Sequence, residues 1–213
     1  MNTDDLIREL AREVGPVSRN AMRHRIVIGA VAGGIVSAVL IVLSLGPRAD
    51  LAVAMGGFSF WMKWSFTLSL AVAGMAMAMQ LARPDGGRLR GLWLGTVPVA
   101  LLVGVGLVEL TQTPSADWLA MWLGHSWQVC SLIVFTLSIP IFAGLLWAFR
   151  RLAPTRLRAA GAAAGLLSGA FSATIYCIHC PEVSAIFVLT WYSLGILLAT
   201  LLGALLGPRL LRW

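Results

Sequence analysis

The segment Tyr-Cys-Ile-His-Cys-Pro-Glu at positions 176–182 is the chemically richest stretch of a chain that is 59% hydrophobic. It holds two of the three cysteines, one of the three histidines and one of the nine carboxylates. It is short and lies between two long apolar runs. Its proline ends a helix because the residue has no N–H group to donate. We interpret the rest of the sequence as a scaffold that holds this segment at one side of a membrane.

Apolar runs that are long enough to cross a bilayer recur along the chain. The mean hydropathy is +0.85 and only 12% of the residues are charged, whereas about a quarter are charged in soluble domains. About 20 apolar residues span a bilayer core. The sequence therefore predicts an all-α membrane protein, with a cytoplasmic N-terminal segment at 1–22 and a transmembrane domain at 23–213. The six predicted spans are 26–45, 61–81, 91–110, 127–149, 159–176 and 183–206.

The basic residues predict the orientation of these spans. Of the 16 Lys and Arg residues, 14 fall on one set of span flanks, and only Arg48 and Lys63 fall on the other. Because basic residues accumulate on the cytoplasmic side, both termini are expected in the cytoplasm, and loops 46–60, 111–126 and 177–182 are expected to face outward. The net charge of +7 therefore reflects topology rather than direct nucleic-acid binding. Lys63 is expected to snorkel to the interface.

Small residues at four-residue spacing predict close helix packing, because they let two backbones approach. We expect these faces to pack within the chain, and a homodimer through one of them is the alternative. The glycines concerned are Gly29 and Gly33, Gly161, Gly165 and Gly169, and Gly203 and Gly207.

The N-terminal segment has an amphipathic helical pattern. Apolar residues recur at helical spacing between acids and arginines, and Gly15-Pro16 ends the pattern. One interpretation is a surface helix on lipid headgroups; the other is a helix that docks into a groove of a soluble partner. The mixed charge of the polar face favours the partner, since a purely basic face suits anionic lipid better. The residues expected to dock are Asp4, Asp5, Leu6, Ile7, Leu10 and Val14.

Thiols, imidazoles and a carboxylate are predicted to converge on the outward layer. Cys130 lies three residues into the fourth span, roughly 5 Å below the interface at 1.5 Å per residue. The pattern leaves four interpretations open: a structural disulfide, a redox- or metal-responsive pair, a catalytic CxxC of a membrane thiol oxidoreductase, and inert buried cysteine. The candidate residues are Cys130, Cys177, Cys180, His125, His179 and Glu182.

Several motifs of the chain resemble one known family. His179-Cys180-Pro181-Glu182 is the most specific, and the others are Thr3–Ile7, Ser138–Pro140, Gly165–Ala170, Ala173–Tyr176, Trp191-Tyr192 and the closing Gly207–Trp213. Together they are similar to the NrsF-like family of six-span bacterial anti-sigma factors. The resemblance implies a multi-pass protein of the bacterial inner membrane that restrains an extracytoplasmic-function sigma factor and releases it under heavy-metal or oxidative stress.

The resemblance also implies roles for individual residues. The two outward cysteines typical of the family match Cys130 and Cys180, whereas Cys177 has no counterpart in the family pattern. Cys130, Cys180 and His179 are the expected ligands of a transient heavy metal, and no permanent cofactor is expected. The N-terminal segment, with the arginine-rich loops 83–90 and 150–158, is expected to hold the sigma factor. The protein is thus expected not to be an enzyme; the alternative is a membrane thiol-disulfide oxidoreductase that uses Cys177 and Cys180.

Overall fold

The computed structural model describes residues 20–82, 91–152 and 154–212, and four single positions in the N-terminal segment, Thr3, Asp5, Ile7 and Glu9. Six helices are long and apolar enough to cross a membrane, and none of the described residues lies in a strand. The prediction of an all-α chain with six candidate spans is therefore confirmed.

The six long helices agree closely with the predicted spans, and short helices fill the loops between them. The fourth span has the predicted bounds, and the last one starts two residues later than expected, because Ala185 is the first helical residue after the buried turn. The helices are α2 (Ala21–Ser44), α3 (Leu51–Ala54), α4 (Phe58–Leu81), α5 (Gly91–Gln112), the 3-10 turn η1 (Ser115–Asp117), α6 (Trp118–Leu123), α7 (Trp127–Phe149), α8 (Leu157–Tyr176), α9 (Ala185–Phe187), the π-helical turn η2 (Val188–Tyr192) and α10 (Ser193–Leu210).

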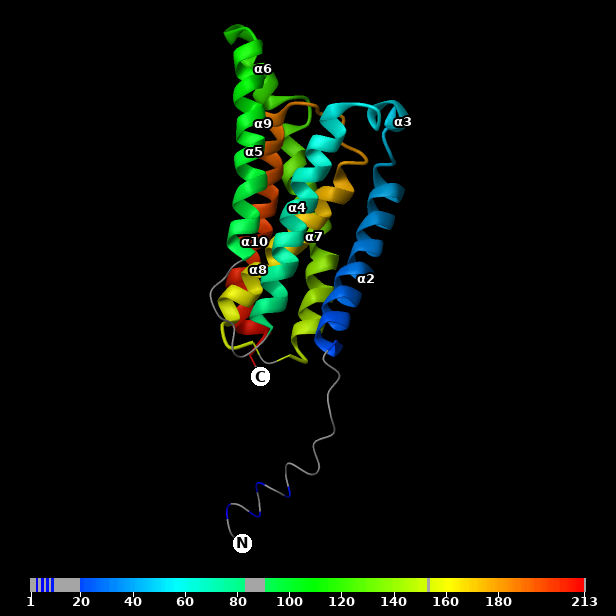
Figure 1. The fold of residues 1–213 in the computed structure, drawn as a ribbon. Coiled ribbons are helices and arrows are strands. Elements are labelled where there is room, and N and C mark those ends of the chain that lie inside the picture. Colours follow the sequence, from blue (N-terminus) through cyan, green and yellow to red (C-terminus); the bar gives the residue numbers. More distant parts are fainter. Residues whose placement is uncertain are drawn as a thin grey trace.

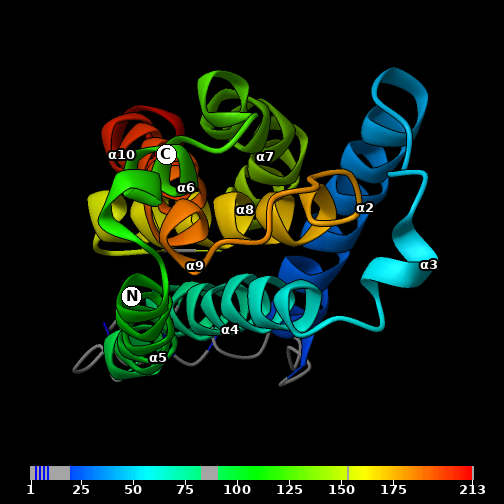
Figure 2. The same ribbon diagram turned by 90° about the horizontal axis from the view of Figure 1, so that it is seen from above.

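Helix α8 occupies the centre of the bundle. Seen from above, α4 lies on one side of it and α7 and α10 lie on the other, while α2 packs against α7 and α5 lies along α4 (Figure 2). Most residues of α8 are buried, whereas α5 exposes most of its side chains. One end of the bundle, the loop end, carries α3, α6 and α9; α2 begins and α10 ends at the opposite end, the termini end (Figure 1).

Close backbone contacts between glycines fix the helix pairs. A β-carbon on Gly161 of α8 would overlap the carbonyl oxygen of Gly203 in α10, and one on Gly165 would overlap the carbonyl oxygen of Ala199. In the same way, Gly29 of α2 lies against the backbone of Gly144 in α7. The predicted glycine faces are thus occupied within the chain. A homodimer through them would have to displace these contacts.

Hydroxyl groups add hydrogen bonds between the helices. The Ser37 hydroxyl of α2 donates to the Leu137 carbonyl of α7 at 2.7 Å, and the Ser172 hydroxyl of α8 donates to the Val134 carbonyl of α7 at 2.8 Å. Thr174 of α8 donates to the Thr67 hydroxyl of α4 at 3.0 Å. Such bonds hold helices together where lipid cannot drive them together by the hydrophobic effect.

The contact between α8 and α10 is tested by Gly161→Leu. The new side chain has no space in front of the Gly203 carbonyl, so the free energy of unfolding should fall by at least about 1–3 kcal/mol, as for other overpacked sites. The measurement is the melting temperature of the protein in detergent. Gly104→Leu in α5 is the matched control, because a β-carbon there has no neighbour within 4 Å. Equal melting temperatures for Gly161→Leu and Gly104→Leu would contradict the packing described.

Candidate functional site

The segment between α8 and α9, residues 177–184, is non-helical, and yet Cys177, Cys180, Glu182 and Ser184 are buried in it. Cys177 and Cys180 have no exposed surface, and Glu182 and Ser184 are at most 9% exposed. The amides of Cys177, Ile178, His179 and Cys180 donate back to the last turn of α8. The carbonyl oxygens of Cys180 and Glu182 accept no hydrogen bond from a backbone amide in the described part of the chain. Buried backbone groups without partners are costly, so other elements must supply donors.

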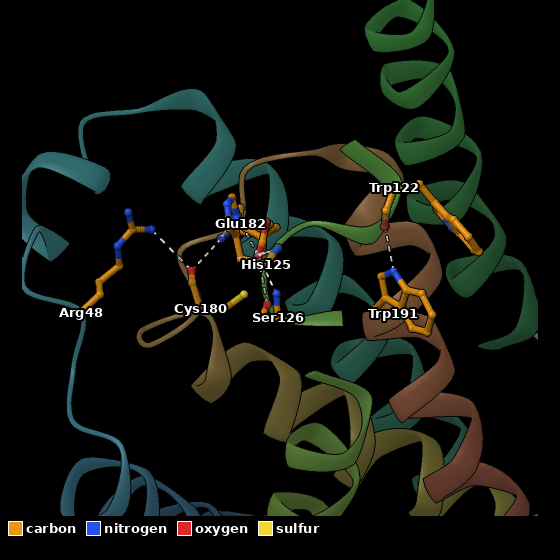
Figure 3. Close-up of polar contacts among 8 residues, drawn as sticks. Arg48, Trp122, His125, Ser126, Cys180, Glu182 and Trp191 are labelled. Carbon is orange, nitrogen blue, oxygen red and sulfur yellow. Dashed lines mark hydrogen bonds and ion pairs between the residues drawn. The ribbon is translucent and has the colours of Figure 1, made fainter. Parts of the chain in front are cut away.

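Lys63 of α4 supplies these donors. Its ammonium donates to the carbonyl oxygen of Cys180 at 3.1 Å and to that of Glu182. Arg48, in the loop after α2, donates to the same Cys180 carbonyl at 3.4 Å (Figure 3). The expectation that Lys63 snorkels to the interface is wrong: its side chain is 1% exposed, because the segment closes over it and offers two acceptors.

The carboxylate of Glu182 caps the start of α7. Its Oε1 accepts hydrogen bonds from the backbone amides of His125 and Ser126, at 2.7 and 3.0 Å, and from the Ser126 hydroxyl at 3.1 Å (Figure 3). Negative charge is stabilising at a helix N-terminus, where amides are unpaired and the helix dipole is positive. His125 therefore contributes its backbone amide. Its ring is 99% exposed, with Nδ1 at 4.0 Å from Glu182 Oε1.

Glu109 plays the corresponding role at the start of α9. Its Oε2 accepts from the Ser184 hydroxyl at 3.0 Å, from the amide of Ala185 at 2.8 Å and from that of Ile186 at 3.3 Å. From the sequence, Glu109 is merely an acid at the outer end of a span. In the structure it fixes the C-terminal side of the 177–184 segment to α5.

The three cysteines are all free thiols and are all buried. The thiol of Cys130, in the first turn of α7, interacts with the thiol of Cys180, and this interaction holds the pKa of the Cys180 thiol below its ordinary value against the opposing effect of burial. The nearby Lys63 ammonium lowers that pKa further. Burial raises the pKa of Cys177 to about 12. Cys180 therefore interacts more strongly with Cys130 than with its sequence neighbour Cys177.

His179 is directed to a different partner. Its Nδ1 lies 2.8 Å from the carbonyl oxygen of Gly46, and its ring lies beside that of Tyr176, with centroids 5.9 Å apart. Among the described residues, no three His, Cys, Asp or Glu side chains form a group that could hold a metal ion. The predicted ligand set of Cys130, Cys180 and His179 is thus not assembled in this arrangement.

A π-helical turn brings Tyr192 to the thiols. In η2, Tyr192 is fully buried beside Cys177 and Cys180, and its hydroxyl acts to lower the pKa of both thiols against the effect of burial. The turn also directs the Trp191 indole outward, where it donates to the Trp122 carbonyl at 2.8 Å (Figure 3). Such turns occur often at functional sites, and no sequence signal announced this one.

The predicted docking residues lie mostly outside the described part of the chain. Asp5 and Ile7 are helical, and Ile7 is exposed. Asp4, Leu6, Leu10 and Val14 lie outside the described residues, as does the loop 83–90.

The whole chain matches one protein family. A family model described as "Negative regulator of sigma F" covers residues 10–213. This chain belongs to the NrsF family. It is 39% identical over 214 residues to "Anti-sigma-F factor NrsF" of Caulobacter vibrioides, and 37% identical over 217 residues to "Probable anti-sigma-F factor NrsF" of Azospira oryzae. Both alignments cover 100% of each chain. No solved structure matches the chain significantly.

Membership of the NrsF family confirms the resemblance inferred from His179–Glu182 and the flanking motifs. It also identifies the class of the protein as an anti-sigma factor, which is a regulatory role. The family name says nothing about the function of the buried thiols at the loop end.

Proposed function

We propose that this protein is an inner-membrane anti-sigma factor that holds an extracytoplasmic-function sigma factor at the cytoplasmic face and releases it when Cys130 and Cys180 react. The observation that carries the proposal is that these two free, fully buried thiols interact across the contact between the first turn of α7 and the segment 177–184. A covalent change at this contact must alter how α7 and the segment fit together. The family membership supplies the sigma factor as the regulated partner.

The chemistry of the pair suits stress that targets thiols. A thiolate is both the nucleophile toward oxidants and the ligand for soft metals, and the lowered pKa of Cys180 increases its thiolate fraction. A two-electron oxidant that takes two electrons and two protons from Cys130 and Cys180 leaves one sulfur–sulfur bond. A heavy metal would bind both sulfurs with loss of their protons, and His179 could join as a third ligand only after leaving Gly46.

The charge distribution supports the proposed orientation. Basic residues gather at the termini end of the bundle, and basic residues accumulate on the cytoplasmic side of membrane proteins. We therefore assign this end to the cytoplasm; the residues are Arg150, Arg151, Arg156, Arg158 and Arg209. The loop end with its thiols then faces outward. The signal would be received on one side of the membrane and the sigma factor held on the other.

The N-terminal segment is the proposed docking element. Its acids, including Asp4 and Asp5, would pair with the basic surfaces with which a sigma factor binds DNA, and its apolar stripe would fill a groove between the helices of that protein. We do not propose that the membrane protein itself binds DNA. Arg150 and Arg151 would extend the docking surface.

The geometry favours regulation over catalysis. A thiol oxidoreductase would cycle Cys177 against Cys180, but the thiol with the largest influence on the pKa of Cys180 is that of Cys130. Burial raises the pKa of Cys177 and so suppresses its thiolate. We propose no resident cofactor, since the reacting stress agent is itself the signal.

Retention of the sigma factor is tested by deleting residues 1–14. The truncated protein should remain in the membrane and lose the sigma factor, so that target genes are transcribed constitutively. Leu6→Asp should act in the same direction, because it places a charge in the apolar stripe. The measurement combines target-gene transcription with co-fractionation of the sigma factor and membranes. Arg8→Lys is the control. If the truncated protein accumulates normally and both measurements match wild type, the segment does not dock the sigma factor.

Sensing is tested by Cys130→Ser and Cys180→Ser. Each variant should keep the sigma factor bound and should lose most of the transcriptional response to a thiol oxidant or a thiol-binding metal, because the second sulfur has no partner. Cys177→Ser, with a sulfur outside the pair, should retain the response. A double variant of Cys130 and Cys180 that responds like wild type would show that these thiols are structural only.

A further inference from the structure

Lys63 is the single lysine of a chain with 15 arginines. It lies in the second turn of α4 and, among the described residues, it is the one basic side chain that is buried. An ammonium is a compact point charge with three donor hydrogens, whereas a guanidinium is a planar fork. The single lysine lies where two backbone carbonyl oxygens accept hydrogen bonds from one buried ammonium.

The acceptors of Lys63 are backbone carbonyls rather than a carboxylate. The two carbonyls belong to Cys180 and Glu182, on either side of Pro181. The nearest carboxylate of the segment, that of Glu182, is already occupied by the amides at the start of α7. A buried cation is stable only while it is hydrogen-bonded. The packing of α4 at the loop end thus depends on the conformation of the segment.

We infer that Lys63 is a positioning residue that couples the 177–184 segment to α4, and so conveys a change at Cys130 and Cys180 to the termini end of the bundle. This inference rests on the proposed sensing by the two thiols. It assigns the route by which the change leaves the sensing layer, which neither the family membership nor the thiols themselves specify.

The route is continuous from the thiols to the far end. Cys180 contributes both the thiol that meets Cys130 and the carbonyl that accepts from Lys63, so a displacement of this residue moves both. Helix α4 is tied to α8 by the bond between Thr174 and Thr67 and by the backbone contact of Gly74 with Leu167. It ends at Leu81 at the termini end. Packed helices switch between discrete arrangements. The hydrogen bonds from Lys63 to the carbonyls of Cys180 and Glu182 would favour one of these arrangements.

Lys63→Met tests the coupling in cells. Methionine fills a similar volume but cannot donate hydrogen bonds to the carbonyls of Cys180 and Glu182. The helix arrangement that holds the sigma factor should therefore no longer be favoured. Transcription of the target genes without stress should rise at least about tenfold per copy of membrane protein, in line with the loss of charge-assisted hydrogen bonds. Ser65→Ala is the matched control, because that exposed hydroxyl of α4 bonds only within its own helix.

The order of events gives a result that a merely structural role would not produce. Adding Cys130→Ser and Cys180→Ser to Lys63→Met should leave transcription high, because Lys63 acts after the thiols. If Lys63→Met accumulates normally and represses and responds like wild type, the inference is wrong while the proposed function stands. If the wild-type chain itself retains no sigma factor, the proposed function fails first.

A measurement on the wild-type protein avoids any loss of folding. Purified protein is treated with diamide, whose N=N bond is reduced to a hydrazine as two thiols lose two electrons and two protons to form a disulfide. Amide hydrogen exchange should then rise together in residues 177–184 and in residues 58–66 of α4. The Cys130→Ser/Cys180→Ser protein should show neither change. Faster exchange in the segment with unchanged exchange in α4 would overturn the coupling.

Discussion

A buried stretch of non-helical backbone must have all its polar groups paired, and the loop end of this protein is built around that requirement. In the segment 177–184, the carbonyl oxygens of Cys180 and Glu182 have no backbone amide as a partner among the residues that the structure describes. Lys63 of α4 donates to both of them, and Arg48, in the loop after α2, donates to that of Cys180. Hydrogen bonds to charged groups contribute about 1.5–3 kcal/mol each, and a buried ammonium without acceptors is strongly destabilising. The segment and α4 therefore stabilise each other.

The carboxylates complete the arrangement from the other side. Glu182, which belongs to the segment, caps α7, and Glu109 of α5 caps α9, the helix that follows the segment. Both helices therefore begin at a carboxylate whose position depends on the segment. The ion pair of Arg48 and Asp50, at 2.6 Å, raises the pKa of the Arg48 guanidinium and lowers that of the Asp50 carboxyl through their mutual hydrogen bond. Elsewhere the bundle is held by glycine contacts that leave little freedom. In the proposed mechanism, the loop end is where a small chemical change shifts the packing.

The sequence predicts the six spans well because long apolar runs and basic flanks are direct consequences of the bilayer. It also indicates that Cys130 and Cys180 lie in one layer, since both follow from span boundaries. It does not predict the role of Lys63: a lysine near a span end usually snorkels, and only the fold of a distant segment decides otherwise. The same applies to Glu109 and to the π-helical turn at Tyr192. These features depend on contacts between residues far apart in the chain, which no local pattern encodes.

We propose that the state of a buried thiol pair at one end of the bundle decides whether a sigma factor is held at the other. The most direct measurement follows both ends in the same cells after an oxidant is added. Differential alkylation and mass spectrometry report the oxidised fraction of Cys130 and Cys180, and membrane fractionation reports the bound sigma factor. We predict that the two change with one time course. Release of the sigma factor while both thiols remain unmodified, or full oxidation with the sigma factor still bound, would contradict the account.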